Sequence, residues 1–267
     1  MSIHSGSAFL IYCCCVAAVL GAVLGSFLNC AAYRIAHGES FLKGRSHCPA
    51  CGHTLGVPDL VPVFSWLLLR GRCRYCGKKV SVRYLLAELF FALVTVVCLL
   101  RCDLTVVCLR NLVFLCCLFC LSLVDLEIFE IPDGCLLIAA AAWLVAQPFT
   151  GMSWRESAFH LLAGVIFGGG LLLLSLLLDS LLKKDTLGGG DIKLYFVVGL
   201  YLGFAATLFS LLLACVLGLL FAFLRNRFGK AIGEPIPFGP SIAAAAAVML
   251  LFGDPMVRWY LGLISVA

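Results

Sequence analysis

Two aspartates, each beside a long apolar run, are the residues of this sequence best placed for catalysis. Asp191 follows three glycines in LGGGDIKL, residues 187–194, and Asp125 lies in VDLEIFEIPD, residues 124–133. A carboxylate at the edge of a membrane segment is costly unless it is paired or used in chemistry. We therefore expect Asp125 and Asp191 to meet and to act on a peptide bond in or near the membrane. The alternative is that both aspartates cap helices at the surface.

Paired carboxyl groups indicate acid–base chemistry. Two such groups a few ångströms apart cannot both ionise easily, so they share one proton. One can then activate a water molecule, and the other can protonate the substrate carbonyl. Gly188, Gly189 and Gly190 permit a tight turn and leave room for a substrate strand beside Asp191. The chain has neither an H-E-x-x-H nor a G-x-S-x-G pattern, which argues against zinc proteases and serine hydrolases of those kinds.

Four cysteines form a second chemical constellation in the polar region of residues 31–83. CPAC and CRYC are C-x-x-C pairs separated by 21 residues, and each is followed by glycine. This spacing is close to that of sites in which four thiolates hold one tetrahedral zinc ion. The sequence therefore predicts a structural zinc site at Cys48, Cys51, Cys73 and Cys76. The alternative is two redox pairs or disulfides, which a cytoplasmic position disfavours.

Composition indicates an integral membrane protein. Of the 267 residues, 63% are hydrophobic and 12% are charged, whereas a soluble domain is nearer half apolar and a quarter charged. The net charge of +5 does not indicate nucleic-acid binding, because the basic residues lie in a few loops between apolar runs. Outside the C-x-x-C pairs, the cysteines lie in or beside apolar runs, where cysteine behaves as a small hydrophobe.

The apolar runs predict an all-α, polytopic fold of about eight transmembrane helices with a cytoplasmic zinc-knuckle-like loop. The expected spans are residues 8–29, 84–100, 104–124, 134–149, 158–178, two within 194–224, and 238–252. The run 194–224 is too long for one comfortable span, and Gly199 and Gly203 offer a break. We expect residues 1–83 to hold the first transmembrane helix and the cysteine loop, and residues 84–267 to form a helical membrane peptidase domain.

The distribution of basic residues predicts which face each loop occupies, because short loops rich in Lys and Arg stay in the cytoplasm. With eight spans and an outside N-terminus, fifteen of the 19 basic residues fall inside or at the inner face. A single span over 194–224 would send Arg225, Arg227 and Lys230 outside, so the charge rule favours the broken form. Asp125 and Asp191 then both lie at the cytoplasmic face.

Five motifs, in order, carry a family resemblance. They are GSFLNCAAYRI at residues 25–35, the paired C-x-x-C loop, VDLEIFEIPD, GGGDIKL and IPFGP at residues 236–240. Over nearly its whole length the sequence resembles the bacterial prepilin peptidases. These are the type IV leader peptidases of pilus assembly and type II secretion, which are GxGD-type aspartic intramembrane peptidases. The resemblance implies that Asp125 and Asp191 are the catalytic aspartates, with residues 188–191 as the GxGD motif.

The resemblance also implies an activity and a location. It implies a multi-pass protein of the bacterial inner membrane that cleaves the short basic leader of type IV prepilins or type II secretion pseudopilins. Cleavage occurs at the cytoplasmic face after a glycine, and many members then methylate the new N-terminal residue with S-adenosylmethionine. The residues that bind this cofactor are not identified by the sequence. The expected partners are the prepilin substrates and membrane lipid, with no nucleic acid.

Two other functions have different signatures. A proton- or cation-coupled transporter needs acids distributed through the depth of the membrane, whereas the clearest pair here lies at one face. A zinc-knuckle membrane scaffold for a secretion machine needs neither aspartate. Glu88 is explained by none of these hypotheses, because it lies within a predicted span. It either pairs with an arginine or lines a polar cavity.

Overall fold

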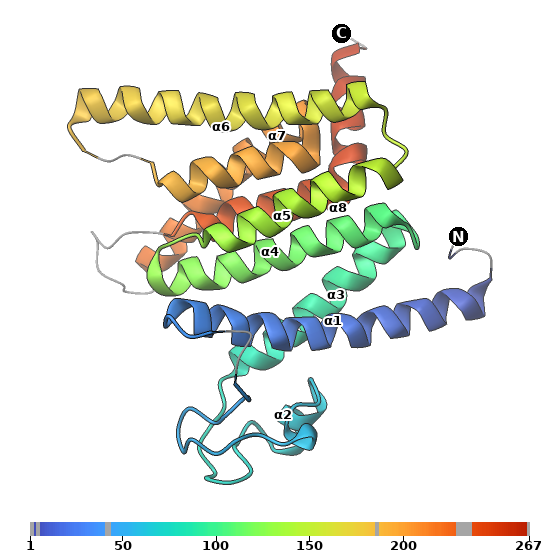
Figure 1. Ribbon diagram of the computed structural model, residues 1–267, viewed down its shortest axis with the longest axis vertical. Helices are drawn as coiled ribbons and strands as arrows, with labels where there is room; N and C mark the ends of the chain where they lie inside the picture. Colours follow the sequence, from blue (N-terminus) through green and yellow to red (C-terminus); the bar gives the residue numbers. More distant parts are fainter. Residues whose placement is uncertain (1–2, 4–5, 41–43, 185–186, 228–236, 266–267) are drawn as a thin grey trace. The chain divides into compact units, whose positions relative to one another are not determined.

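The computed structural model describes residues 3, 6–40, 44–184, 187–227 and 237–265, and all of its long elements are helices (Figure 1). Six helices are long and apolar enough to cross a membrane. They are α1 (Ser7–Ala36), α3 (Val82–Cys102), α4 (Val106–Ile128), α6 (Trp154–Leu182), α7 (Gly189–Arg227) and α8 (Gly239–Ser265). A shorter apolar segment comprises α5 (Asp133–Ala146) and η3 (Gln147–Phe149), while η2 (Val57–Asp59) and α2 (Phe64–Leu68) lie in the cysteine loop. The predicted all-α class is confirmed.

The chain forms two compact units, residues 1–108 and 109–267. In the first unit α1 packs along α3 through two glycines. A Cβ on Gly21 or on Gly25 would lie 2.8 Å from a backbone carbonyl oxygen of α3, so only glycine permits this approach. This division groups α3 with α1. The sequence analysis placed a domain boundary after residue 83, which would group α3 with the peptidase helices instead. That functional division stays a prediction.

In the second unit α6 runs along the first part of α7 (Figure 1). A Cβ on Gly199 would lie 2.5 Å from the Cα of Gly164, so the two backbones are in direct contact. On another side of α7, the ring of Tyr201 stacks on Phe114 of α4 with centroids 3.9 Å apart. Its hydroxyl donates a hydrogen bond to the Ala139 carbonyl of α5 at 2.9 Å. Three helices, α4, α5 and α6, therefore contact residues 189–202 of α7.

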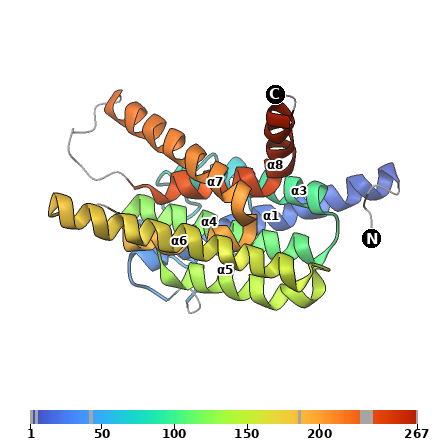
Figure 2. The same ribbon diagram turned by 90° about the horizontal axis from the view of Figure 1, so that it is seen from above.

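Helix α7 is interrupted at Gly203, where φ is 69° and ψ is −173°. Figure 2 shows the two parts of α7 running in different directions. His160 of α6 donates a hydrogen bond from Nδ1 to the Leu200 carbonyl at 2.9 Å, next to the interruption. The predicted break is thus confirmed at Gly203, whereas Gly199 remains helical and serves the contact with α6. Positive φ at Gly203 suits glycine because it has no Cβ.

The second part of α7 runs back toward the region where α8 begins. Gly218 is so close to Phe238 that an added Cβ would lie 2.7 Å from its ring. Phe238 in turn lines a cavity with Asp191, which lies at the start of α7. The path of α7 is therefore that of two antiparallel segments, as the hypothesis of a broken span requires.

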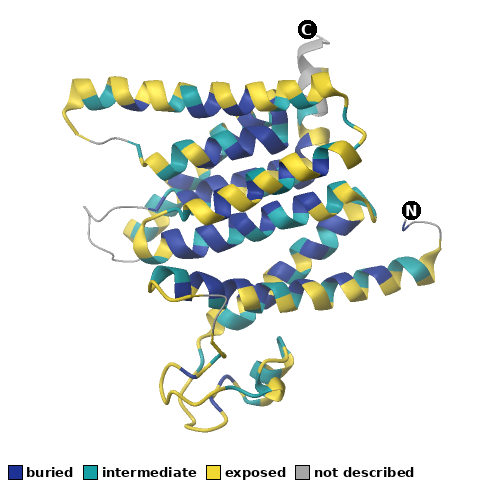
Figure 3. Cartoon of the chain, in the orientation of Figure 1, coloured by how far each residue is buried: buried dark blue, intermediate teal, exposed yellow. Residues whose placement is uncertain are grey.

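The outer faces of the helices are apolar, as a lipid environment requires. Figure 3 shows long exposed stretches on α6, and its exposed side chains include Leu173, Leu177 and Phe159. The segment of residues 60–69 does not span. It forms a turn followed by the five-residue helix α2, with Phe64 and Leu68 exposed.

We predict that Gly199→Ala destabilises the protein while Gly169→Ala does not. Both glycines lie in helices, so both substitutions raise helix propensity by about 1 kcal/mol. The new methyl group meets the α6 backbone at position 199 but nothing within 4 Å at position 169. Overpacking of this kind costs about 1–3 kcal/mol. Thermal unfolding in detergent should separate the two variants, and equal melting temperatures would contradict the packing described.

Candidate functional site

A cavity of about 590 Å³ in the second unit contains both predicted aspartates. Its walls come from the end of α4, the segment that leads into α5, the first turn of α7 with the residues before it, and the two residues before α8. Asp125 is 5% exposed, and Asp191 is partly buried. Both aspartates line this one cavity. Residues 66 positions apart (191 minus 125) thus share one site.

The N-terminus of α8 holds the Asp125 carboxylate. The backbone N–H of Gly239 donates a hydrogen bond to Asp125 Oδ2 at 2.9 Å, and this bond is buried. A Cβ on Gly239 would lie 2.6 Å from the same oxygen. Because the free N–H groups and the dipole at a helix N-terminus favour negative charge, α8 stabilises the ionised form of Asp125 at this position.

Gly239 is a site residue to which the sequence analysis gave no role. The motif around it was part of the family resemblance, and Ile236 of that motif lies outside the described residues. A local signal existed, because Gly239 begins α8 and Pro240 occupies its first turn, a position that proline favours. The sequence did not indicate that Gly239 would contact Asp125, which is 114 positions away.

The three glycines before Asp191 have different surroundings. A Cβ on Gly188 would lie 3.1 Å from Asp191 Oδ2, and one on Gly190 would lie 2.9 Å from Ile131 Cβ. Gly189 has nothing within 4 Å of the position of a Cβ. A larger residue at position 190 would therefore displace Ile131, and one at position 188 would crowd the Asp191 carboxylate, whereas position 189 opens on free space. The predicted contact of these glycines with substrate stays a prediction.

An ion pair crosses one edge of the cavity. Lys193 Nζ lies 2.8 and 3.0 Å from the two carboxylate oxygens of Asp133 and joins the first turn of α7 to the first turn of α5. Glu130 is exposed and lines the same cavity. With four acidic residues and one lysine among its lining residues, the cavity favours positively charged ligands.

The chain leaves α4 through a strained turn next to the aspartates. Phe129 has φ of 58° and lines the cavity, while its N–H bonds to the Asp125 carbonyl at 3.0 Å. A bulky residue at positive φ is uncommon and persists only where the surrounding structure fixes it, often at functional sites. Nothing in the sequence marks this position, because phenylalanine is not a turn residue.

The four predicted metal-ligating cysteines also come together, within the first unit. The Sγ atoms of Cys48, Cys51, Cys73 and Cys76 all lie within 4.8 Å of one another, and those of Cys48 and Cys76 are 3.9 Å apart. Four thiolates around a tetrahedral zinc ion lie about 3.8 Å apart, given a Zn–S bond of about 2.3 Å. The cluster can therefore hold a metal ion.

The two C-x-x-C pairs form the same local structure. The N–H of Gly52 bonds to the Cys48 carbonyl at 2.9 Å, and that of Gly77 bonds to the Cys73 carbonyl at 3.0 Å. Both glycines have φ of 69°, which accounts for the glycine after each pair. The backbone thus turns each pair of thiols toward the other pair.

The thiols of the cluster differ in acidity. Burial opposes ionisation of Cys48, but hydrogen bonds from the Ala50 and Cys51 backbone and from neighbouring thiols lower its pKa to about 7. The Lys78 backbone N–H favours the Cys76 thiolate, but burial and the neighbouring thiols outweigh it and raise its pKa to about 11. One thiolate therefore forms readily near neutral pH, as metal binding requires.

Comparison with known protein families matches two regions of the chain. Residues 19–102 match the bacterial peptidase A24 N-terminal domain, and residues 112–223 match the type IV leader peptidase family. The four cysteines fall in the first region. Asp125 and Asp191 fall in the second.

Several proteins named prepilin leader peptidase/N-methyltransferase are similar to this chain. A protein of Bacillus subtilis is 32% identical over 248 residues, which cover 91% of this chain and 96% of that protein. A protein of Aeromonas salmonicida is 34% identical over 235 residues, covering 82% and 75%. One of Burkholderia pseudomallei is 32% identical over 266 residues, covering 90% and 85%. No solved structure matches the chain significantly.

Proposed function

The chain belongs to the bacterial family of prepilin leader peptidase/N-methyltransferases, and from this premise we propose that Asp125 and Asp191 are its catalytic aspartates. The observation that carries the proposal is the cavity that contains both carboxyl groups. Their helices belong to one compact unit, and each aspartate lies at or near a helix end that faces the cavity.

In the proposed reaction the two carboxyl groups share one proton. The ionised group takes a proton from a water molecule, whose oxygen attacks the carbonyl carbon of the scissile bond. The protonated group gives its proton to the carbonyl oxygen. Collapse of the tetrahedral intermediate then breaks the C–N bond as the leaving nitrogen receives a proton. The Gly239 N–H keeps Asp125 in place during these transfers.

We further propose that the substrates are prepilins or pseudopilins and that their basic leader enters from the cytoplasm. The acidic cavity, with Glu130 exposed at its edge, suits a positively charged segment. The open space at Gly189 suits an extended strand beside Asp191. A transporter is less well supported, because the acids gather in one cavity rather than along a path through the membrane.

The second proposed activity is methyl transfer from S-adenosylmethionine to the new N-terminus, as the names of the relatives imply. The amine nitrogen forms a bond to the methyl carbon, the sulfonium S–CH3 bond breaks with its electron pair going to sulfur, and the nitrogen loses one proton.

The third part of the proposal is that the four-cysteine cluster holds structural zinc. Four sulfur ligands fill a tetrahedral zinc ion, so no position remains for substrate. Zinc then acts by fixing the cysteine loop, in which the described secondary structure is limited to η2, the short helix α2 and isolated bridges.

We predict that Asp125→Asn and Asp191→Asn each reduce prepilin cleavage by at least about a hundredfold, because acid–base transfer needs both carboxyl groups. The asparagine side chains preserve shape, so insertion and thermal stability should change little. Cleavage of a purified prepilin measures the effect. Full processing by either variant would eliminate the aspartyl mechanism.

Gly239→Ala should lower cleavage about tenfold to a hundredfold, because the new methyl group displaces Asp125. Gly134→Ala is the matched control, since Gly134 lies in the first turn of α5 with nothing within 4 Å of the added Cβ. The same cleavage assay applies. Equal activity of the two variants would show that the Gly239 contact is not needed.

Metal analysis of the purified protein should give about one equivalent of zinc. Changing any of Cys48, Cys51, Cys73 or Cys76 to Ser should reduce this content, because each supplies one thiolate. Cys15→Ser is the control, since Cys15 is an exposed cysteine of α1 outside the cluster. A zinc content unaffected by all four substitutions would refute the site.

A further inference from the structure

We propose that Cys98 of α3 and Cys108 of α4 form a disulfide bond at the membrane face opposite the aspartates. Both cysteines belong to the first unit, and their Sγ atoms lie 4.0 Å apart. Neither belongs to the four-cysteine cluster or lines the cavity of the aspartates. The inference rests on the cytoplasmic location proposed for the catalytic site, because that location places these two thiols on the other side of the membrane.

The turn between α3 and α4 brings the two thiols together (Figure 1). Thr105 connects the two helix ends, because its hydroxyl donates a hydrogen bond to the Cys102 carbonyl at 2.8 Å and accepts one from the Cys108 N–H at 3.2 Å. The second of these bonds caps the N-terminus of α4. Asp103 has φ of 53°, and its Oδ1 accepts a hydrogen bond from the Ile3 N–H at 3.2 Å. The turn is therefore fixed by hydrogen bonds of its own, independently of the sulfur contact.

The geometry of the pair is close to that of a bond. The Sγ of Cys98 lies 3.8 Å from the Cys108 carbonyl oxygen, so this side chain reaches the backbone of α4 itself. A disulfide places its two sulfurs about 2 Å apart, so each sulfur has to move by about 1 Å, which a change of side-chain rotamer can supply. Because the boundary between the two units follows residue 108, the bond restrains the segment that connects them.

The location of the pair favours a lasting bond. Helix α4 has 23 residues and is therefore about 34 Å long, enough to cross a hydrocarbon core of about 30 Å. Cys108 lies in its first turn and Asp125 in its last. With Asp125 at the cytoplasmic face, Cys108 lies at the extracytoplasmic face, where disulfides form and persist. The alternative is a pair of reduced thiols in a weak hydrogen bond.

The exposure of the two thiols sets the order of the reaction. Cys98 is 0% exposed, whereas Cys108 is partly exposed. The oxidant is a protein disulfide carried by a thiol oxidoreductase of the extracytoplasmic compartment. The Cys108 thiolate attacks one sulfur of that disulfide to form a mixed disulfide, and the other sulfur leaves as a thiolate. The Cys98 thiolate then attacks the Cys108 sulfur and displaces the oxidoreductase, whose two sulfurs take up the two protons that the cysteines lost.

Peptide mapping without reduction tests the bond. Cells are quenched in acid, free thiols are alkylated in denaturant, and the full-length protein is purified and digested with trypsin. Cleavage after Arg83, Arg101 and Arg110 places Cys98 in residues 84–101 and Cys108 in residues 102–110. We expect mass spectrometry to find these two peptides joined in most molecules and separate after reduction.

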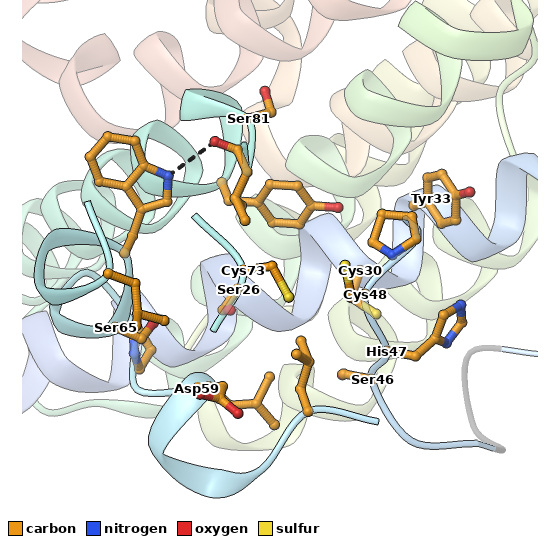
Figure 4. Close-up of a pocket in the computed structure, with 18 of the residues that line it drawn as sticks. Ser26, Cys30, Tyr33, Ser46, His47, Cys48, Asp59, Ser65, Cys73 and Ser81 are labelled. Carbon is orange, nitrogen blue, oxygen red and sulfur yellow. Dashed lines mark hydrogen bonds between the residues drawn. The ribbon is translucent and has the colours of Figure 1, made fainter. Parts of the chain in front are cut away.

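Three variants identify the bonded cysteines. Cys98→Ser and Cys108→Ser should each abolish the joined peptides, whereas the control Cys102→Ser, one turn from Cys98 on α3, should retain them. Cys48 and Cys73 of the metal cluster, drawn in Figure 4, are the internal reference and should be alkylated, because a cytoplasmic loop keeps its thiols reduced.

Two results overturn the disulfide. They are alkylated thiols at both Cys98 and Cys108 of the wild type, and joined peptides that persist in Cys108→Ser. Either result leaves the proposed peptidase intact, because prepilin cleavage by the aspartate variants tests that function separately. Cleavage by Cys98→Ser and Cys108→Ser should continue, which shows that both variants fold.

Discussion

The arrangement of the second unit depends on one contact, the hydrogen bond from the Gly239 N–H to Asp125. A carboxylate that is 5% exposed in a membrane helix is unfavourable unless a donor meets it. The donor is a helix N-terminus, so α8 must begin at the end of α4, and its first residue must lack a side chain. The return of α7 toward Phe238 follows from the same requirement, because the chain has to reach this point before α8 starts.

A second constraint fixes the other aspartate. Lipid gives no hydrophobic driving force between helices, so close backbone approach has to supply the packing energy. Gly164 and Gly199 provide that approach, and Tyr201 adds a stack and a hydrogen bond from the opposite side. The segment that carries Asp191 is consequently rigid up to Gly203. The interruption there frees α7 to reverse, and His160 satisfies the Leu200 carbonyl that the interruption exposes.

The sequence predicts features that depend on local pattern. Hydropathy located the apolar helices, although α5 is shorter than the span predicted over residues 134–149. Glycine located the break in α7, and the repeated C-x-x-C-G pattern predicted a cluster whose geometry follows from two similar turns. Features that depend on distant partners were not predictable. The bond between Gly239 and Asp125, the Glu88 contact with Val63 and the positive φ of Phe129 arise from tertiary packing. The spacing of residues along the chain does not predict these three features.

The chemistry of the two proposed reactions fixes their order. Before cleavage the nitrogen that receives the methyl group belongs to a peptide bond, and resonance makes its lone pair a poor nucleophile. Hydrolysis, which we propose takes place at Asp125 and Asp191, converts this nitrogen into an amine, so methylation has to follow cleavage.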